Sequence, residues 1–262
     1  MFSKCIFTNL TVGCWNIEGV YEKVNSVKIS KLEKPSFEET LNKHDVLCLQ
    51  ETHLSQNELI PDFNGYVSMP HCRNISANNR YFGGMIIFIK TSIRNGIKIR
   101  TNFDQDALEA TFLKNFFGLE KDVKYLFTYA SPINSPYTKS RTVNILDKIE
   151  TQYIDANHYG IIMGDLNGKT KKDDDFVHDD LDNHSPINIF PYNKDSLPLK
   201  RQNMDEHAID EQGKLILNLC KNSALRILNG RIPGDESGRY TRYPSKLENN
   251  QAPLIMLYAV LL

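Results

Sequence analysis

The stretch Gly160-Ile161-Ile162-Met163-Gly164-Asp165-Leu166-Asn167 decides the fold class, because it is an apolar run that ends in a carboxylate and an amide. Two isoleucines and a methionine between glycines predict a short buried strand. Asp165 and Asn167 are two residues apart, so an extended backbone presents both from one face at the carboxyl end of that strand. Such a pair can orient a water molecule and bind a metal ion or a phosphate oxygen. The same residues also suit an ordinary turn after a strand.

The arrangement recurs twice upstream, which favours the functional interpretation over the turn. A β-prone run beginning at Leu10 ends in Asn16, and the apolar run that starts at Asp45 is followed by Glu51. Ligand sites in layered α/β proteins form where several strand ends converge. Oxygen donors with no neighbouring His or Cys cluster suit a hard cation, so we predict a Mg²⁺ site, with Mn²⁺ as a possible substitute.

Five short motifs follow one another along the chain. They are Trp15–Gly19, Leu49–Thr52, Gly83–Phe88, Tyr129–Pro132 and Gly164–Asn167. In order and approximate spacing they resemble motifs of the endonuclease/exonuclease/phosphatase superfamily, from about residue 8 to the end. The resemblance implies an α/β (α+β) fold of the DNase I-like type, a four-layer sandwich of two packed, mainly antiparallel sheets flanked by helices. It also implies a hydrolase that uses Mg²⁺ to cleave phosphodiesters or phosphomonoesters.

A further likeness concerns a subgroup of that superfamily. Ile227–Arg231, Gly234–Asp235 and Gly238–Thr241 resemble segments of the endonuclease domain of non-LTR retrotransposons. This implies a DNA endonuclease-like phosphodiester hydrolase of retroelement origin, with nucleic acid, above all DNA, as substrate.

The resemblance also implies roles for single residues. Glu51 matches the principal metal carboxylate, and Asn16 matches the amide that contacts the metal or the scissile phosphate. Asp165 matches the carboxylate that orients or deprotonates the attacking water. Asn167 matches the amide that holds the adjacent phosphate oxygens, and Tyr129 matches a phenol that contacts the transition-state phosphate. Metal and fixed donors are needed there because phosphoryl transfer spreads negative charge over several oxygens.

The C-terminal part departs from the family pattern. The family carries a late Ser-x-Ile-Asp-Tyr-type segment whose Asp orients a catalytic His in one of the last strands. The matching stretch here is Leu254–Val260, so Leu257 takes the place of the aspartate, and no residue up to Leu262 can be the histidine. We therefore expect a truncated copy that lacks the last strands, with activity weakened or lost. Two alternatives stay open: a non-catalytic remnant that binds nucleic acid or protein, and a small-molecule phosphoester hydrolase of the same superfamily.

Composition is ordinary and excludes few classes. The 262 residues can bury a sizeable core, but the formal net charge of −1 gives little electrostatic support for a nucleic-acid binder. Five cysteines without a Cys-x-x-Cys pair argue for a reducing compartment and against a zinc site. The first residues lack a signal peptide, and the apolar stretch Ala252–Leu262 is too short to span a bilayer, so it predicts a buried strand. We expect an intracellular protein, cytoplasmic or nuclear, without membrane attachment.

The remaining pattern predicts one domain over residues 1–262, incomplete at its C-terminus. A polar surface loop with solvated acids is expected at 169–203, and His53 is expected on the surface after its strand. A capping-box pattern at Ser36–Glu39 predicts a helix to about Lys43. The other expected elements are a meander of strands at 82–90, 108–113 and 123–130, a helix containing Val143, Leu146 and Ile149, and a helix capped by Asn203 with Glu206 that contains Ile209, Leu215, Ile216 and Leu219.

Overall fold

The computed structural model describes residues 10–73, 81–139, 141, 143–153, 159–177, 200–205, 207–238 and 255–259. The chain divides into two compact units, the first made of Met1–Ala130 with Ile161–Asp165, the second of Ser131–Gly160 with Leu166–Leu262. Within the described ranges, no helix has the length and apolar character needed to cross a membrane.

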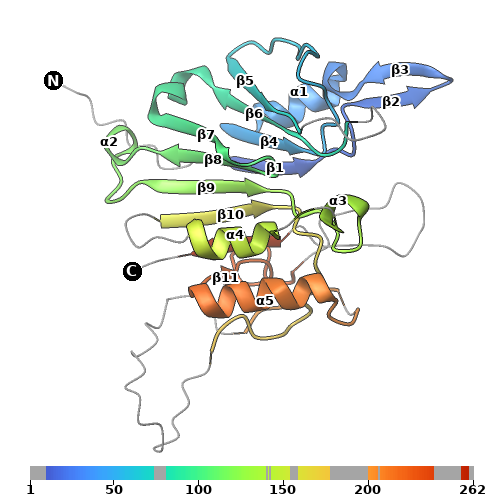
Figure 1. The fold of residues 1–262 in the computed structure, drawn as a ribbon. Helices are drawn as coiled ribbons and strands as arrows, with labels where there is room; N and C mark the ends of the chain where they lie inside the picture. Colours follow the sequence, from blue (N-terminus) through green and yellow to red (C-terminus); the bar gives the residue numbers. More distant parts are fainter. Residues whose placement is uncertain are drawn as a thin grey trace, which may run out of the picture. The chain divides into compact units, whose positions relative to one another are not determined.

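The first unit contains a four-stranded sheet in the order β1 (Val12–Asn16), β4 (Val46–Gln50), β6 (Met85–Lys90) and β5 (Tyr66–His71). β1 and β4 are parallel, whereas β6 is antiparallel to both of its neighbours (Figure 1). Every residue of β4 is buried. A strand covered on both faces shows an almost unbroken apolar run in the sequence, which is why this one is predicted well.

A second sheet contributes neighbouring strands β7 (Ile97–Asp104), β8 (Ala107–Phe112), β9 (Val123–Thr128) and β10 (Tyr159–Gly164). The predicted meander is wrong in one respect, because β6 belongs to the first sheet and β7 takes its place beside β8. β7 was not predicted because four of its eight residues are exposed, so the strand has no apolar run in the sequence.

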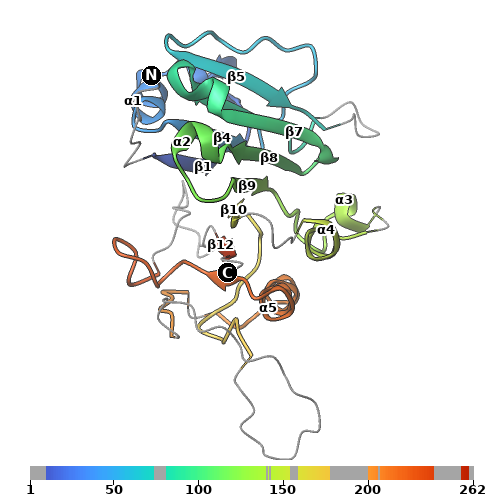
Figure 2. The same cartoon turned by 90° about the vertical axis from the view of Figure 1, so that its left-hand side faces the viewer.

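The two sheets of the first unit are joined by direct contacts. β5 and β7 run near each other in Figure 1 and in Figure 2, and the His71 ring nitrogen Nε2 donates a hydrogen bond to the Asp104 carbonyl oxygen at 2.8 Å. On the other face of the first sheet lies α1 (Pro35–Asn42), which buries Phe37 and Leu41.

The predicted capping box at Ser36–Glu39 is not used. α1 begins two residues earlier than this pattern predicts, at Pro35, with Lys34 as an N-cap that makes no side-chain hydrogen bond. Proline suits the first helical position because its missing N–H would have no intrahelical partner there. The remaining elements of the unit are β2 (Tyr21–Val24), β3 (Val27–Ser30), η1 (Lys31–Glu33), η2 (Thr91–Gly96) and α2 (Lys114–Phe117).

The second unit contains the helix pair α4 (Ile145–Gln152) and α5 (Glu211–Ser223), which lie side by side (Figure 1). Both helices were predicted, but the N-caps are Asn144 and Asp210. The expected Asn203 cap is wrong, since the Asn203 side chain binds Asp205 N and Lys171 O instead. The other elements are α3 (Pro136–Lys139), β11 (Arg226–Ile227) and β12 (Ile255–Ala259), of which β11 and β12 pair in antiparallel fashion.

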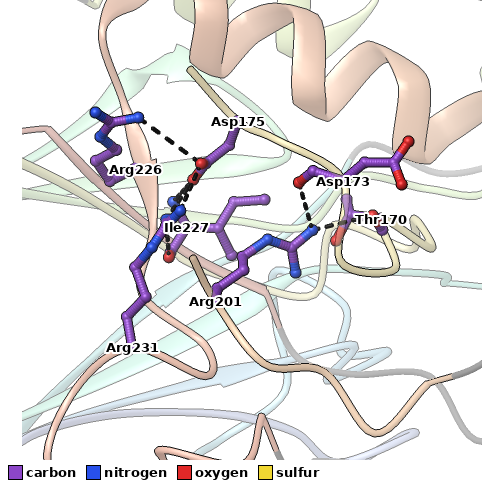
Figure 3. A network of polar contacts seen from close by, with 7 residues as sticks. All are labelled: Thr170, Asp173, Asp175, Arg201, Arg226, Ile227 and Arg231. Atoms are coloured by element: carbon purple, nitrogen blue, oxygen red, sulfur yellow. Dashed lines mark hydrogen bonds and ion pairs between the residues drawn. The ribbon is translucent and has the colours of Figure 1, made fainter. Parts of the chain in front are cut away.

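The expected surface loop at 169–203 is partly buried where it is described. Asp175 is fully buried, and its carboxylate accepts hydrogen bonds from the Arg231 guanidinium at 2.5 and 2.7 Å and from the Ile227 backbone N–H at 2.7 Å (Figure 3). Arg226 lies 3.8 Å from the same carboxylate. Asp175 is therefore a structural anion and not a solvated one, because arginines from distant segments surround it.

A second arginine ties the same loop to its own backbone. Arg201 is buried and donates from Nη2 to the carbonyl oxygens of Thr170 at 3.0 Å and Asp173 at 3.3 Å (Figure 3). The Asp173 side chain itself is exposed, as predicted for the acidic run. The loop thus combines exposed acids with a buried polar centre.

Candidate functional site

The carboxyl ends of β1 and β4 place two predicted residues side by side. Asn16 closes β1 and pairs in register with Gln50, which closes β4 and is followed by Glu51. Parallel neighbours end at the same edge of a sheet, so their terminal side chains meet there. The strand ends therefore converge as the sequence predicted.

Asp165 lies at this same edge. Its backbone N–H donates to Gln50 Oε1 at 2.9 Å, and its Oδ2 accepts a hydrogen bond from Asn16 Nδ2 at 3.0 Å. Gln50 is fully buried, so this contact fixes the backbone of Asp165 from inside the unit. Asn16 and Asp165, which are 149 positions apart in sequence, thus form a direct carboxylate–amide pair.

Tyr129 connects this pair to Glu51. Its phenol lies close enough to the Glu51 and Asp165 carboxylates to be affected by both charges. Burial, the Glu51 carboxylate and the Asp165 charge together raise the pKa of Tyr129 far above its usual range. Tyr129 therefore stays a neutral hydrogen-bond donor at all ordinary pH values.

The backbone around Glu51 is held in an uncommon conformation. Glu18, Glu51 and His53 all have positive φ angles, of 49°, 53° and 56°. A left-handed conformation costs a residue with a Cβ roughly 1–2 kcal/mol. Short backbone bonds hold the segment, from Gly19 N to Glu51 O at 2.6 Å and from His53 N to Gly83 O at 2.9 Å. Such strained conformations cluster at functional sites, where the surrounding structure imposes them.

His53 lies closer to the site than predicted. It was expected on the surface, yet its Nε2 is 3.8 Å from Glu51 Oε2 and its side chain is 32% exposed. Burial lowers the pKa of His53, the Glu51 charge opposes this effect, and the Arg73 charge reinforces it. The backbone at Glu51 and His53 is left-handed and departs from strand geometry, so strand alternation does not predict this closeness.

Two further residues at the site carry no sequence signal of their own. Arg73 Nε donates to Asp106 Oδ1, and both side chains are buried. The Arg73 guanidinium carbon lies 5.3 Å from the centre of the Tyr129 ring. The Gly83–Gly84 pair is an indirect signal, because a Cβ at Gly83 would lie 2.5 Å from the guanidinium.

The last predicted site residue, Asn167, belongs to the second unit. Its backbone has a φ of 48°, so the residue turns the chain directly after Asp165 and Leu166. Leu257, at the position where the family pattern has an aspartate, pairs with Ile227 between β12 and β11 of the same unit. The role predicted for Asn167 stays a prediction.

The donor set of the first unit fits a hard cation. Over the described ranges, no three His, Cys, Asp or Glu side chains group as a metal site would require. Mg²⁺, however, is commonly held by one or two carboxylates together with water and substrate phosphate oxygens. Glu51, Asp165 and the amide of Asn16 offer such oxygens and include no sulfur ligand.

Gly164 provides a structural test of the site. Its φ is 152°, and a Cβ there would overlap the Thr128 carbonyl oxygen and lie 2.5 Å from Gln50 Nε2. We expect Gly164→Ala to lower the free energy of unfolding by about 1–3 kcal/mol, because overpacking displaces β9 or Gln50. Urea unfolding followed by circular dichroism measures the change, with Gly118→Ala, where no atom lies within 4 Å of a Cβ, as the control for positive φ. Equal stability losses in the two variants would contradict the predicted steric conflict.

The chain is similar to known proteins in sequence and in structure. A sequence model described as the endonuclease/exonuclease/phosphatase family matches residues 13–243. No curated protein matches the chain. The AP endonuclease from Archaeoglobus fulgidus is similar in structure, with a TM-score of 0.50, 15% identity, and coverage of 95% of this chain and 86% of that one. An endonuclease/exonuclease/phosphatase family protein from Leptotrichia buccalis has a TM-score of 0.46 and 12% identity, with coverage of 95% of this chain and 87% of that one. Humanized D. rerio TDP2 has a TM-score of 0.43 and 13% identity, with coverage of 95% of this chain and 82% of that one. The predicted DNase I-like α/β sandwich is confirmed.

Proposed function

Because this chain belongs to the endonuclease/exonuclease/phosphatase family, we propose that it is a Mg²⁺-dependent phosphodiester hydrolase that acts on nucleic acid, and on DNA first of all. The observation that supports this most directly is the hydrogen bond between the Asn16 amide and the Asp165 carboxylate, at the strand edge where Glu51 also lies. We further propose that the chain derives from a retroelement, on the strength of its Ile227–Arg231 and Gly238–Thr241 segments.

The contacts of Asp165 and Tyr129 within the first unit support this proposal. Asp165 is fixed by Gln50 and Asn16, so its carboxylate can orient a water molecule for attack and accept its proton. The neutral phenol of Tyr129 can donate a hydrogen bond to charge that develops on the phosphate oxygens. Asn167 is proposed to hold the neighbouring phosphate oxygens.

Glu51 and Asn16 would hold the metal ion. When bound, Mg²⁺ supplies positive charge that polarises the phosphoryl oxygen and increases the acidity of bound water. The Asn16 Oδ1 atom already accepts a hydrogen bond from Glu18 N at 3.0 Å, which orients this carbonyl and leaves one lone pair available.

We propose that hydrolysis is slow compared with relatives that retain the aspartate at the position of Leu257. A leucine in β12 cannot accept a hydrogen bond from a catalytic histidine. General acid–base help of this kind is typically worth about 10²–10⁴-fold in rate.

The proposal is tested with supercoiled plasmid DNA, purified full chain and Mg²⁺ or Mn²⁺, with EDTA as the blank. Metal-dependent conversion to the nicked circle is the expected result. Complete lack of nicking with both metals, at enzyme concentrations comparable to those of the plasmid, would overturn the proposed activity.

Metal binding is predicted to depend on Glu51. Loss of a residue that merely supports a ligand weakens metal affinity by about 10–100-fold, so we expect Glu51→Gln to weaken Mn²⁺ binding at least as strongly. Calorimetry measures the affinity, and the fluorescence of Trp15, the single tryptophan, reports the event from the residue before Asn16. Glu150→Gln on α4 is the control. If wild type and Glu51→Gln bind Mn²⁺ equally, Glu51 is not the metal carboxylate.

A further inference from the structure

The buried ion pair of Arg73 and Asp106 lies next to the candidate site without a role in the chemistry described above. We propose that these two are positioning residues that hold the ring of Tyr129 in place beside Glu51. The inference rests on the proposed function, since it concerns the same site, and its test includes a measurement that does not depend on cleavage.

The first argument is burial combined with contact. Arg73 and Asp106 are 6% and 2% exposed, and Arg73 Nε donates directly to the Asp106 carboxylate. The guanidinium also lies 5.3 Å from the Tyr129 ring centre, within the range of a cation–π contact. The pair therefore packs against the ring of Tyr129.

Asp106 fixes Tyr129 a second time through its backbone. The Asp106 carbonyl oxygen accepts the Tyr129 N–H at 2.9 Å. The Asp106 N–H in turn donates to Asp104 Oδ1 at 3.0 Å, which fixes the turn between β7 and β8. One residue thus holds the backbone of Tyr129 while its carboxylate holds the cation beside the Tyr129 ring.

Arg73 also contacts a segment that is hydrogen-bonded to the backbone next to Glu51. The guanidinium packs against Gly83, whose φ of 68° and missing Cβ leave the space that it occupies. The Gly83 carbonyl oxygen accepts the His53 N–H at 2.9 Å, two residues after Glu51. Arg73 is therefore in contact both with Tyr129 and with the segment that holds the backbone next to Glu51.

If the ion pair of Arg73 and Asp106 only stabilised the fold, its replacement by apolar residues would leave activity unchanged. Replacing both charges of a buried pair by apolar side chains of similar volume often leaves stability unchanged or higher. The variant Arg73→Met/Asp106→Leu keeps the backbone carbonyl that binds Tyr129 and removes only the side-chain contacts. If the pair positions Tyr129, this variant is folded but impaired.

The kinetic test combines this double variant with Tyr129→Phe in a mutant cycle, using Mg²⁺-dependent cleavage of a labelled DNA duplex. We expect kcat to fall about 10–100-fold in the double variant, as for a misplaced catalytic group, while KM changes by less than about threefold. Adding Tyr129→Phe should then cause little further loss. Arg231→Met is the matched control, since it removes an equally buried arginine bound to a carboxylate in the second unit. Its kcat per folded molecule should equal that of the wild type.

The second measurement uses 3-fluorotyrosine placed at position 129 and observed by fluorine NMR. The proposal expects one sharp resonance in the wild type and in Arg231→Met, and a shifted or broadened one in Arg73→Met/Asp106→Leu. Wild-type kcat in the double variant, additive loss with Tyr129→Phe, or an unchanged resonance would overturn the positioning role. If the wild type cleaves no DNA, the proposed function fails, and the resonance alone decides whether Arg73 and Asp106 position Tyr129.

Discussion

Replacing Asp165 by Ala should lower the rate of Mg²⁺-dependent plasmid nicking by about 10²–10⁴-fold, the usual value of a positioned general base. The physical reason lies in the contacts of this carboxylate. Gln50 holds its backbone and Asn16 holds one of its oxygens, so the other oxygen is presented in a fixed direction. Alanine removes the acceptor but leaves the backbone hydrogen bond to Gln50 intact, so the fold should be kept.

Two further variants sharpen this prediction. Asp165→Asn keeps an oxygen for the Asn16 amide but loses the basic carboxylate, so it should be impaired almost as strongly as the alanine variant. Asp173→Ala removes an exposed carboxylate of the second unit and should nick at the wild-type rate. Robust nicking that survives in Asp165→Ala would show that another group activates the water.

The second large effect concerns the stability of the second unit. Replacing Asp175 by Asn should lower the free energy of unfolding by about 3–5 kcal/mol, because removing one partner of a buried ion pair leaves the other charge uncompensated. Here that charge is Arg231, which is only 1% exposed, with Arg226 close by (Figure 3). Chemical denaturation at neutral pH measures the loss, with Asp173→Asn as the exposed control.

The difference in the free energy of unfolding between wild type and Asp175→Asn should decrease in acid. Burial would raise the pKa of Asp175, but hydrogen bonds from Arg231 and the Ile227 N–H outweigh it, and the pKa lies below the ordinary 3.8. A carboxyl whose pKa is depressed by folding stabilises the native state above the unfolded pKa, and this contribution is lost as the pH falls through the folded value. The stability difference between wild type and Asp175→Asn should therefore shrink as the pH falls below about 4. A constant difference from pH 7 to pH 3 would mean that Asp175 is not ionised in the native state.

Elements with a strong local pattern were predictable from sequence, and elements with a weak one were not. β4 shows its burial directly as an apolar run, and α4 and α5 show apolar residues at helical spacing. β7 alternates irregularly between exposed and buried positions, so its identity depends on pairing with β8. The start of α5 was misplaced because both Asn203 and Asp210 are good N-cap residues, and only tertiary contacts of Asn203 distinguish them.

The residues of the candidate site also divide into those with a local sequence pattern and those without one. Asn16, Glu51 and Asp165 lie at the ends of recognisable strands, so their convergence could be predicted from the sequence. Arg73 and Asp106 are 33 positions apart in sequence and lie outside any periodic pattern. The packing of the sheets brings them together, so their pairing cannot be predicted from the sequence alone.

The discontinuity of the first unit has a consequence for how the chain folds during synthesis. Residues up to Ala130 leave the ribosome first, and the segment Ile161–Asp165 joins them only after the intervening part of the second unit has been made. At typical translation rates of about 5–20 residues per second, this interval lasts seconds. Until β10 arrives, β9 exposes an open strand edge, which is the feature that chaperones shield and that nascent chains use to associate wrongly. The nascent protein thus displays Asn16, Glu51 and Tyr129 before Asp165 can complete the site.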